Sequence, residues 1–312
     1  MDKADYAHIN TKEINESHYR TIIICTFNLS KDLIIFPSEN AMKDYCKTKD
    51  LPEGCEEYNL ILQKQYNGLA MPLLEVKFFR TKRFGVKKFF TIDKFIPVPR
   101  ESNRLFNKNI DRYTFCTAYK SSGKKHYKYT FNFEPDPQDS SKNFQTYLFN
   151  HRKARLSDMP KNGNDEGNFR WILTNKYPKQ KYTYSLFLLD AGQPSLTDNM
   201  DTSKMELDPK NELIQNRPWM GKSLQSPYEI ATLIHLADNH GTFSIHQTAC
   251  LKIHKSKYLK GLESDSIHSL NMDELNFIIT SIVSKFTSEK NTTINDSMQK
   301  LNKSHYTLTL VM

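Results

Sequence analysis

Apolar and polar residues alternate most regularly between Arg112 and Phe133. Alternate residues of a β-strand point to opposite faces, so this pattern predicts two strands that each bury one face. The residues predicted to face the core are Tyr113, Phe115, Thr117, Tyr119, Tyr127, Tyr129, Phe131 and Phe133. Between the two arms stands Ser-Ser-Gly-Lys, in which Gly123 is expected to supply the positive φ of a short connection. The segment is therefore predicted to be a β-hairpin.

Other short apolar stretches are typical of strands. The stretches predicted to be strands are residues 21–28, 32–36, 58–64, 73–79, 89–98, 146–149, 168–173, 181–189, 242–253 and 306–312. Helical signals are fewer. Ser38 is a suitable N-cap for a helix over residues 38–47. Ser226-Pro227-Tyr228-Glu229 has the residues of a helix start, which predicts a second helix that ends at Asn239-His240-Gly241.

The longest helical period lies in residues 272–286, near the end of the chain. The apolar residues that follow this period are Leu275, Ile278, Ile279, Ile282, Val283 and Phe286. Phe277 widens the apolar arc, which favours a buried helix over a helix that binds a partner. The predicted fold is α+β and β-rich, with mostly antiparallel strands in a barrel or sandwich and this helix packed into or across it.

Composition changes along the chain and suggests four parts. Residues 1–19 are polar and are expected to form a flexible tail, and residues 20–190 are expected to form the β-rich domain. Residues 191–222 are polar, contain three prolines and have no period, so we expect a linker or a long surface excursion. Residues 223–312 are expected to be a helix-rich part that either stands apart or completes the same domain.

The chain is basic, with 44 Lys and Arg against 35 Asp and Glu, a net charge of +9. A basic balance favours anionic partners such as nucleic acid or acidic lipid, although a solvated basic surface gives the same count. Gly is scarce, and the sequence contains none of the patterns GxxxxGK[ST], GxGxxG, HExxH or GxSxG. These absences disfavour the common nucleotide-binding, zinc-protease and serine-hydrolase classes, and no cofactor is predicted.

The five cysteines are odd in number and no two have CxxC spacing. This usage predicts reduced thiols and a cytoplasmic or nuclear protein rather than a secreted one. The polar N-terminal residues do not resemble a signal peptide, and no apolar run reaches the roughly 20 residues of a membrane span.

Basic residues gather at two predicted hairpin tips. The candidate anion-binding residues are Lys82, Arg83, Lys87 and Lys88 at one tip and Lys120, Lys124 and Lys125 at the other. If the tips are adjacent, they suit phosphates of lipid headgroups or of nucleic acid. The neighbouring aromatics are predicted to point inward, which disfavours stacking on bases. The alternative is that lysines simply keep exposed turns soluble.

Four histidines lie close in sequence, together with Asp238. His235 and His240 are five residues apart across an expected helix end, which is poor spacing for two metal ligands on one face. His246 lies in an expected strand and His254 just after it, eight residues further on. No metal is predicted; His235, His246 and His254 are weak candidates that would have to converge in space, and residues 235–254 are the best place for an enzymatic His/Asp site.

Two further features are open to two interpretations. Ser157 follows Arg152, Lys153 and Arg155, which is a possible phosphorylation site or simply part of an exposed loop over residues 151–167. Trp219 and Met220 either fasten the polar stretch to the β-domain or dock a partner.

The sequence therefore favours a non-enzymatic intracellular binding or adaptor protein. Its expected partner is an anionic surface, with acidic lipid headgroups preferred, or another protein, recognised through the basic tips. A nucleic-acid-associated regulatory protein and an enzyme that uses residues 235–254 are the alternatives.

Overall fold

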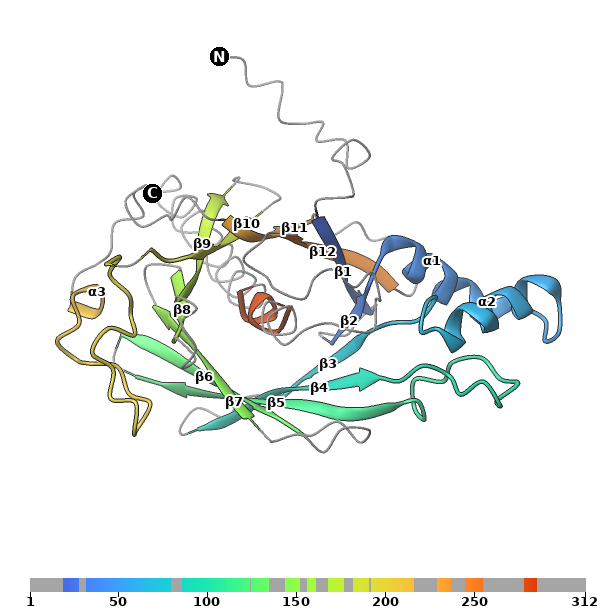
Figure 1. Ribbon diagram of the computed structural model, residues 1–312, viewed down its shortest axis with the longest axis horizontal. Coiled ribbons are helices and arrows are strands. Elements are labelled where there is room, and N and C mark those ends of the chain that lie inside the picture. Colours follow the sequence, from blue (N-terminus) through green and yellow to red (C-terminus); the bar gives the residue numbers. More distant parts are fainter. Residues whose placement is uncertain are drawn as a thin grey trace, which may run out of the picture.

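A computed structural model of the chain shows twelve described strands that close into an antiparallel barrel (Figure 1). Each strand pairs with its neighbours in sequence, and β1 closes the barrel against β12. The structure describes residues 19–27, 32–79, 86–123, 125–134, 144–151, 156–160, 168–176, 182–190, 192–215, 229–236, 245–254 and 278–284. The fold is thus an up-and-down barrel, which confirms the β-rich, antiparallel architecture expected from the sequence.

The strands are β1 (Tyr19–Phe27), β2 (Leu33–Phe36), β3 (Leu74–Phe78), β4 (Lys87–Phe95), β5 (Arg112–Ser122), β6 (His126–Phe133), β7 (Phe144–His151), β8 (Leu156–Met159), β9 (Phe169–Lys176), β10 (Tyr182–Leu188), β11 (Glu229–His235) and β12 (Ile245–His254). The helices outside the barrel are α1 (Glu39–Lys47), the 3-10 turn η2 (Thr48–Asp50), α2 (Glu56–Tyr66) and α3 (Glu212–Gln215). In Figure 1, α1 and α2 lie on one side of the barrel and α3 on the other.

A helix fills the centre of the barrel (Figure 1). It is described over residues 278–284, and none of these seven side chains is more than 2 % exposed. Ile278, Ile279, Ile282 and Val283 belong to the main hydrophobic core with the inner faces of the strands. The Trp171 indole on β9 donates to the Thr280 hydroxyl at 2.9 Å, so a buried polar group of the helix is satisfied. The prediction of a buried C-terminal helix packed into the barrel is confirmed.

The predicted hairpin is β5 and β6, and Tyr129, Phe131 and Phe133 face the core as expected. The inner face of β5 differs from the prediction. Ile92 lies opposite Cys116 and Asp93 opposite Thr114, so Phe115 is the extra residue of a β-bulge. Beyond the bulge the alternation is reversed: Cys116 and Ala118 join the core.

The structure corrects the sequence interpretation of this hairpin at two points. Thr117 and Tyr119 lie outside the main core cluster, and Lys120 takes the inner face opposite Tyr129. The reason given for Gly123 is also wrong, because Gly123 has no positive φ. A Cβ at Gly123 would instead overlap the His126 side chain, so close approach explains the glycine.

Two segments were assigned the wrong secondary structure from local pattern: one predicted strand is a helix, and one predicted helix is a strand. Residues 58–64 were expected to be a strand but lie in α2, where Tyr58, Ile61, Leu62 and Gln65 are buried at helical spacing. Residues 229–235 were expected to continue a helix but form β11, whose Ala231 and Leu233 face the core. The helix α1 is confirmed, with the Ser38 hydroxyl accepting from the Ala41 backbone N–H.

The barrel takes strands from both halves of the chain. β11 and β12 complete the sheet between β10 and β1, so the described residues after 228 belong to the same barrel as residues 19–190. Residues 192–215 form an ordered excursion that ends in α3 and packs on the outside of the wall. Of the tail expected over residues 1–19, Tyr19 belongs to β1 and residues 1–18 lie outside the described residues, as does the strand expected at 306–312. None of the described helices has the length and hydropathy needed to cross a membrane.

Candidate anion-binding end of the barrel

The up-and-down topology assigns each connection between strands to one of two barrel ends. Six connections, which follow β1, β3, β5, β7, β9 and β11, leave the same end, called the basic end below. In sequence they contain eleven Lys or Arg and two Asp, a net charge of +9. The basic residues are Lys31, Arg80, Lys82, Arg83, Lys124, Lys125, Arg152, Lys153, Arg155, Lys179 and Lys181, and the acidic ones are Asp32 and Asp238.

The five connections at the opposite end differ in charge. In sequence they contain thirteen Lys or Arg and nineteen Asp or Glu, a net charge of −6. The order of the strands therefore divides the charge of the connections unequally in sequence, which is not evident before the topology is known. The described excursion over residues 192–215 starts from the opposite end but runs along the wall, so that Gln215 contacts Lys125.

The two tips predicted to bind anions belong to this basic end and are adjacent. Lys87, the first residue of β4, is the register partner of Lys120 on β5. β4 also carries Lys88, and Lys125 lies in the β5–β6 connection, directly before β6. Lys82, Arg83 and Lys124 lie outside the described residues. The strand register therefore brings the described ends of the two hairpins together, whereas anion binding by these residues stays a prediction.

The described lysines of these tips have different surroundings. The Lys120 ammonium lies 3.9 Å from the centroid of the Tyr127 ring and 5.2 Å from that of Tyr129, on the inner face of the barrel. Such cation–π contacts hold a positive charge next to aromatic faces. Lys120 is therefore held by the barrel interior, and its charge adds to the potential of the basic end from inside.

Lys87 and Lys88 are the described cations best placed to meet a partner. Lys88 is exposed, Lys87 is half-buried, and neither occurs in an ion pair among the described residues. The Lys88 ammonium lies 4.7 Å from the centroid of the Phe79 ring. Lys125 is exposed, and its ammonium donates to the Gln215 carbonyl at 2.9 Å, next to the end of α3.

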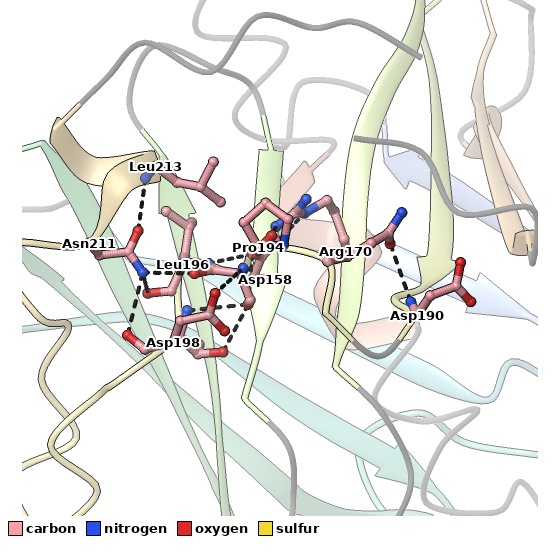
Figure 2. A network of polar contacts seen from close by, with 11 residues as sticks. Asp158, Arg170, Asp190, Pro194, Leu196, Asp198, Asn211 and Leu213 are labelled. Carbon is pink, nitrogen blue, oxygen red and sulfur yellow. Dashed lines mark hydrogen bonds and ion pairs between the residues drawn. The ribbon is translucent and has the colours of Figure 1, made fainter. Parts of the chain in front are cut away.

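The most deeply buried charges in the described residues are Asp158 on β8 and Arg170 on β9, both 0 % exposed (Figure 2). Arg170 Nε and Nη2 donate to the two Asp158 carboxylate oxygens at 2.7 and 2.6 Å. Burial opposes the charged form of Arg170, but the Asp158 carboxylate raises the pKa of the guanidinium above its ordinary value. Sequence reasoning missed this pair.

The pair also holds the excursion of residues 192–215. Asp158 Oδ2 accepts from the Ser195 hydroxyl at 3.0 Å and the Leu196 backbone N–H at 2.8 Å, and Arg170 donates to the Pro194 carbonyl. Asn211 continues the network by donating to the Ser195 carbonyl at 2.7 Å (Figure 2). Asp158 Oδ2 thus bonds both Arg170 and the excursion, while Oδ1 bonds Arg170, so the network fixes the excursion to the barrel wall.

Ser157 lies inside the barrel wall. It is 3 % exposed on β8, and its hydroxyl accepts from the Asn150 amide at 2.7 Å. The expectation that residues 156–159 form part of an exposed loop is wrong, because this segment completes the sheet between β7 and β9. A kinase would reach Ser157 only if β8 left the sheet. Arg152, Lys153 and Arg155 lie outside the described residues.

The candidate histidines have separate environments. His235 is buried against the Tyr182 and Tyr184 rings, and His246 Nε2 lies 2.8 Å from the Thr26 hydroxyl. His254 contacts the edge of Tyr19, at the other end of β12 from His246. Eight residues of extended strand span about 26 Å, so these two cannot share a metal ion.

Across the described residues, no group of three or more His, Cys, Asp or Glu side chains has the geometry to hold a metal ion. His240 and Asp238 lie outside the described residues, as do Trp219 and Met220.

The fold defines the class: an up-and-down antiparallel barrel with an internal helix. The family model named DIA1 matches residues 16–292, about nine-tenths of the chain. The chain belongs to the DIA1 family. Neither a curated protein nor a solved structure matches it.

Proposed function

We propose that this protein is a non-enzymatic intracellular binding or adaptor protein that recognises an anionic surface, preferably acidic lipid headgroups, through the basic end of its barrel. The observation that carries the proposal is that Lys87 and Lys88 lie without a carboxylate partner among the described residues, at the end of the barrel where the connections carry +9 in sequence, against −6 in the other connections. A field with one positive end orients the molecule toward a negative surface and increases its rate of encounter.

The lysines at the adjacent tips support contact with phosphates. Lys87 and Lys88 have no carboxylate partner among the described residues, so their charge is not neutralised internally. A lysine near an anionic membrane contributes about 1 kcal/mol of attraction, and several acting together give stable association. By contrast, the aromatic residues Tyr129 and Phe131 are buried and are not available to stack on nucleic-acid bases.

The cysteines support an intracellular location, in the cytoplasm or nucleus. All five are free thiols. Burial raises the pKa of Cys25 to about 12 and that of Cys250 to about 11, so both remain protonated and unreactive at neutral pH. A chain stabilised by its core rather than by disulfides is suited to a reducing compartment.

Co-sedimentation with vesicles tests the proposal. The protein is mixed with vesicles of phosphatidylcholine alone or with added phosphatidylserine or phosphoinositide, at low and high salt. We expect binding only with acidic lipid, and Lys87→Glu/Lys88→Glu should weaken it at least about tenfold, because two attractive charges become repulsive. The matched control is Lys43→Glu/Lys47→Glu on α1, which makes the same charge change on exposed lysines at the opposite end.

The outcomes separate the alternatives. An equal loss in both double variants would show that only net charge matters and that the basic end is not the site. Binding without dependence on acidic lipid would overturn the proposal. Salt-dependent binding to an RNA or DNA duplex, with no binding to vesicles, would favour the nucleic-acid alternative.

A further inference from the structure

Two large apolar side chains are exposed at the basic end. Phe79 follows the last residue of β3 and is 42 % exposed, and Val86 precedes the first residue of β4 and is 73 % exposed. The Phe79 backbone N–H donates to the Phe89 carbonyl at 3.0 Å, so the pairing of β3 and β4 reaches as far as Phe79. The two side chains therefore flank the β3–β4 connection, immediately beside Lys87 and Lys88.

The other exposed large apolar residues of the described chain are Leu60, Leu69 and Ile110. Leu60 and Leu69 belong to the β2–β3 connection and Ile110 to the β4–β5 connection, which lie at the opposite, acidic end. Phe79 and Val86 thus differ from them in having exposed apolar area directly next to cations that lack carboxylate partners. Apolar and basic groups at one tip are the combination that binds the interface of an anionic bilayer.

We infer that Phe79 and Val86 enter the acyl boundary of an acidic bilayer, while Lys87 and Lys88 lie at its phosphates. This rests on the proposed function and adds to it that the partner is a lipid bilayer and not a soluble phosphate or a nucleic-acid backbone. A phosphate in water leaves the two apolar side chains exposed, whereas a bilayer removes them from water.

The contact between Lys88 and Phe79 fits this orientation. The Lys88 ammonium lies 4.7 Å from the Phe79 ring centroid. A long basic side chain keeps its charged group at the level of the phosphates while its methylene stem and neighbouring ring occupy the apolar layer below. The inserted residues and the phosphate-binding residues thus come from two adjacent strands of one hairpin.

The first test removes apolar area without changing charge. Phe79→Ser/Val86→Ser is compared with Leu60→Ser/Ile110→Ser, which alters similarly exposed apolar residues at the opposite end. On vesicles of phosphatidylcholine and phosphatidylserine, the tip variant should bind roughly tenfold more weakly, because the free energy of burying apolar area is lost. Its residual binding should disappear at high salt, whereas the control should retain the wild-type affinity and its salt-resistant part.

The second test reports insertion itself and does not depend on the serine variants. In Val86→Trp, tryptophan emission should shift to shorter wavelength when acidic vesicles are added, and lipids brominated along the acyl chain should quench it. Leu60→Trp should show neither effect. Both spectra are taken as differences from the wild type, which contains Trp171 and Trp219.

The results distinguish insertion from the underlying function. If Val86→Trp emission is unchanged and the serine tip variant binds like the wild type, while Lys87→Glu/Lys88→Glu still loses binding, insertion is wrong and electrostatic recognition stands. If the wild type does not bind acidic vesicles at all, both proposals are overturned.

Discussion

The buried ion pair Asp158–Arg170 and the lysines Lys87 and Lys88 show two different uses of charge in one barrel. The pair is 0 % exposed and each charge has a matched partner at 2.6 Å. Lys87 and Lys88 lie at the surface without a carboxylate partner in the described chain. Charge that is matched and buried fixes the excursion of residues 192–215 to the wall, whereas unmatched charge at the end of the barrel remains available to an external anion.

A second network of ion pairs is less buried than the Asp158–Arg170 pair, but its carboxylates are matched by basic side chains. Glu75 on β3 and Asp93 on β4 are register partners, and Arg112 Nη1 lies 3.0 Å from Glu75 and 3.1 Å from Asp93. Lys77 also contacts Asp93 at 3.0 Å. Neighbouring strands thus satisfy these carboxylates with basic side chains. These carboxylates use up the charge of the basic side chains around them, whereas Lys87 and Lys88 have no such partner among the described residues.

Asp158→Asn tests the largest expected difference between the two groups, the contribution of the buried ion pair to stability. The change leaves the Arg170 charge buried without a counter-charge, which typically costs about 3–5 kcal/mol. We expect a loss of unfolding free energy of that size, measured by denaturant titration. Neutralising the surface lysines in Lys87→Gln/Lys88→Gln should change the same quantity by no more than about 0.5 kcal/mol.

Binding to acidic vesicles, measured at a temperature where both variants remain folded, should be affected more by the lysine changes than by Asp158→Asn. Asp158→Asn should retain it and Lys87→Gln/Lys88→Gln should weaken it. Equal stability losses in the two variants would show that the buried pair contributes no more than surface charge and would remove the distinction between the two groups.

Thr280→Val should give a smaller effect, because it removes a neutral partner and not a charge. Valine preserves the shape of threonine but leaves the Trp171 indole N–H buried without its acceptor, at a cost of about 1–3 kcal/mol. The control is Thr280→Ser, which keeps the hydroxyl and should lose less stability. Denaturant midpoints measure the difference, and a valine variant as stable as the wild type would show that this hydrogen bond does not fix the helix in the barrel.

The periodic parts of this structure were predictable from sequence. Alternation in β6 identified the core face with Tyr129 and Phe131, and the helical period of residues 272–286 indicated the buried helix. The bulge at Phe115 was not predictable, because its register depends on β4, a separate segment of the chain. It reversed the orientation expected for the end of β5 and turned Lys120 inward.

Only part of the candidate site could be predicted from the sequence in the same way. The two basic tips could be identified, but their adjacency follows from the pairing of Lys87 with Lys120, and the separation of charge follows from the order of all twelve strands. Local pattern also misassigned β11, where a helix-start motif precedes residues that pair with β10 and β12. Neighbouring strands decided the conformation there, since strand preference depends on context.

His254 should give the smallest effect and tests a partly buried charge without a close counter-ion. Burial lowers the pKa of His254 below its ordinary value, and the Glu229 carboxylate opposes this only in part. The unfolded chain therefore binds a proton more readily than the folded one, so stability should fall as the pH decreases below about 6.5. After screening by solvent, the His254 contribution should be roughly a few tenths of a kcal/mol.

In denaturant titrations between about pH 7 and pH 5, His254→Gln should show a shallower loss of stability than the wild type, since glutamine does not titrate. Identical slopes would mean that His254 is solvated in the same way in both states, and the contact with Tyr19 would then carry no pH dependence.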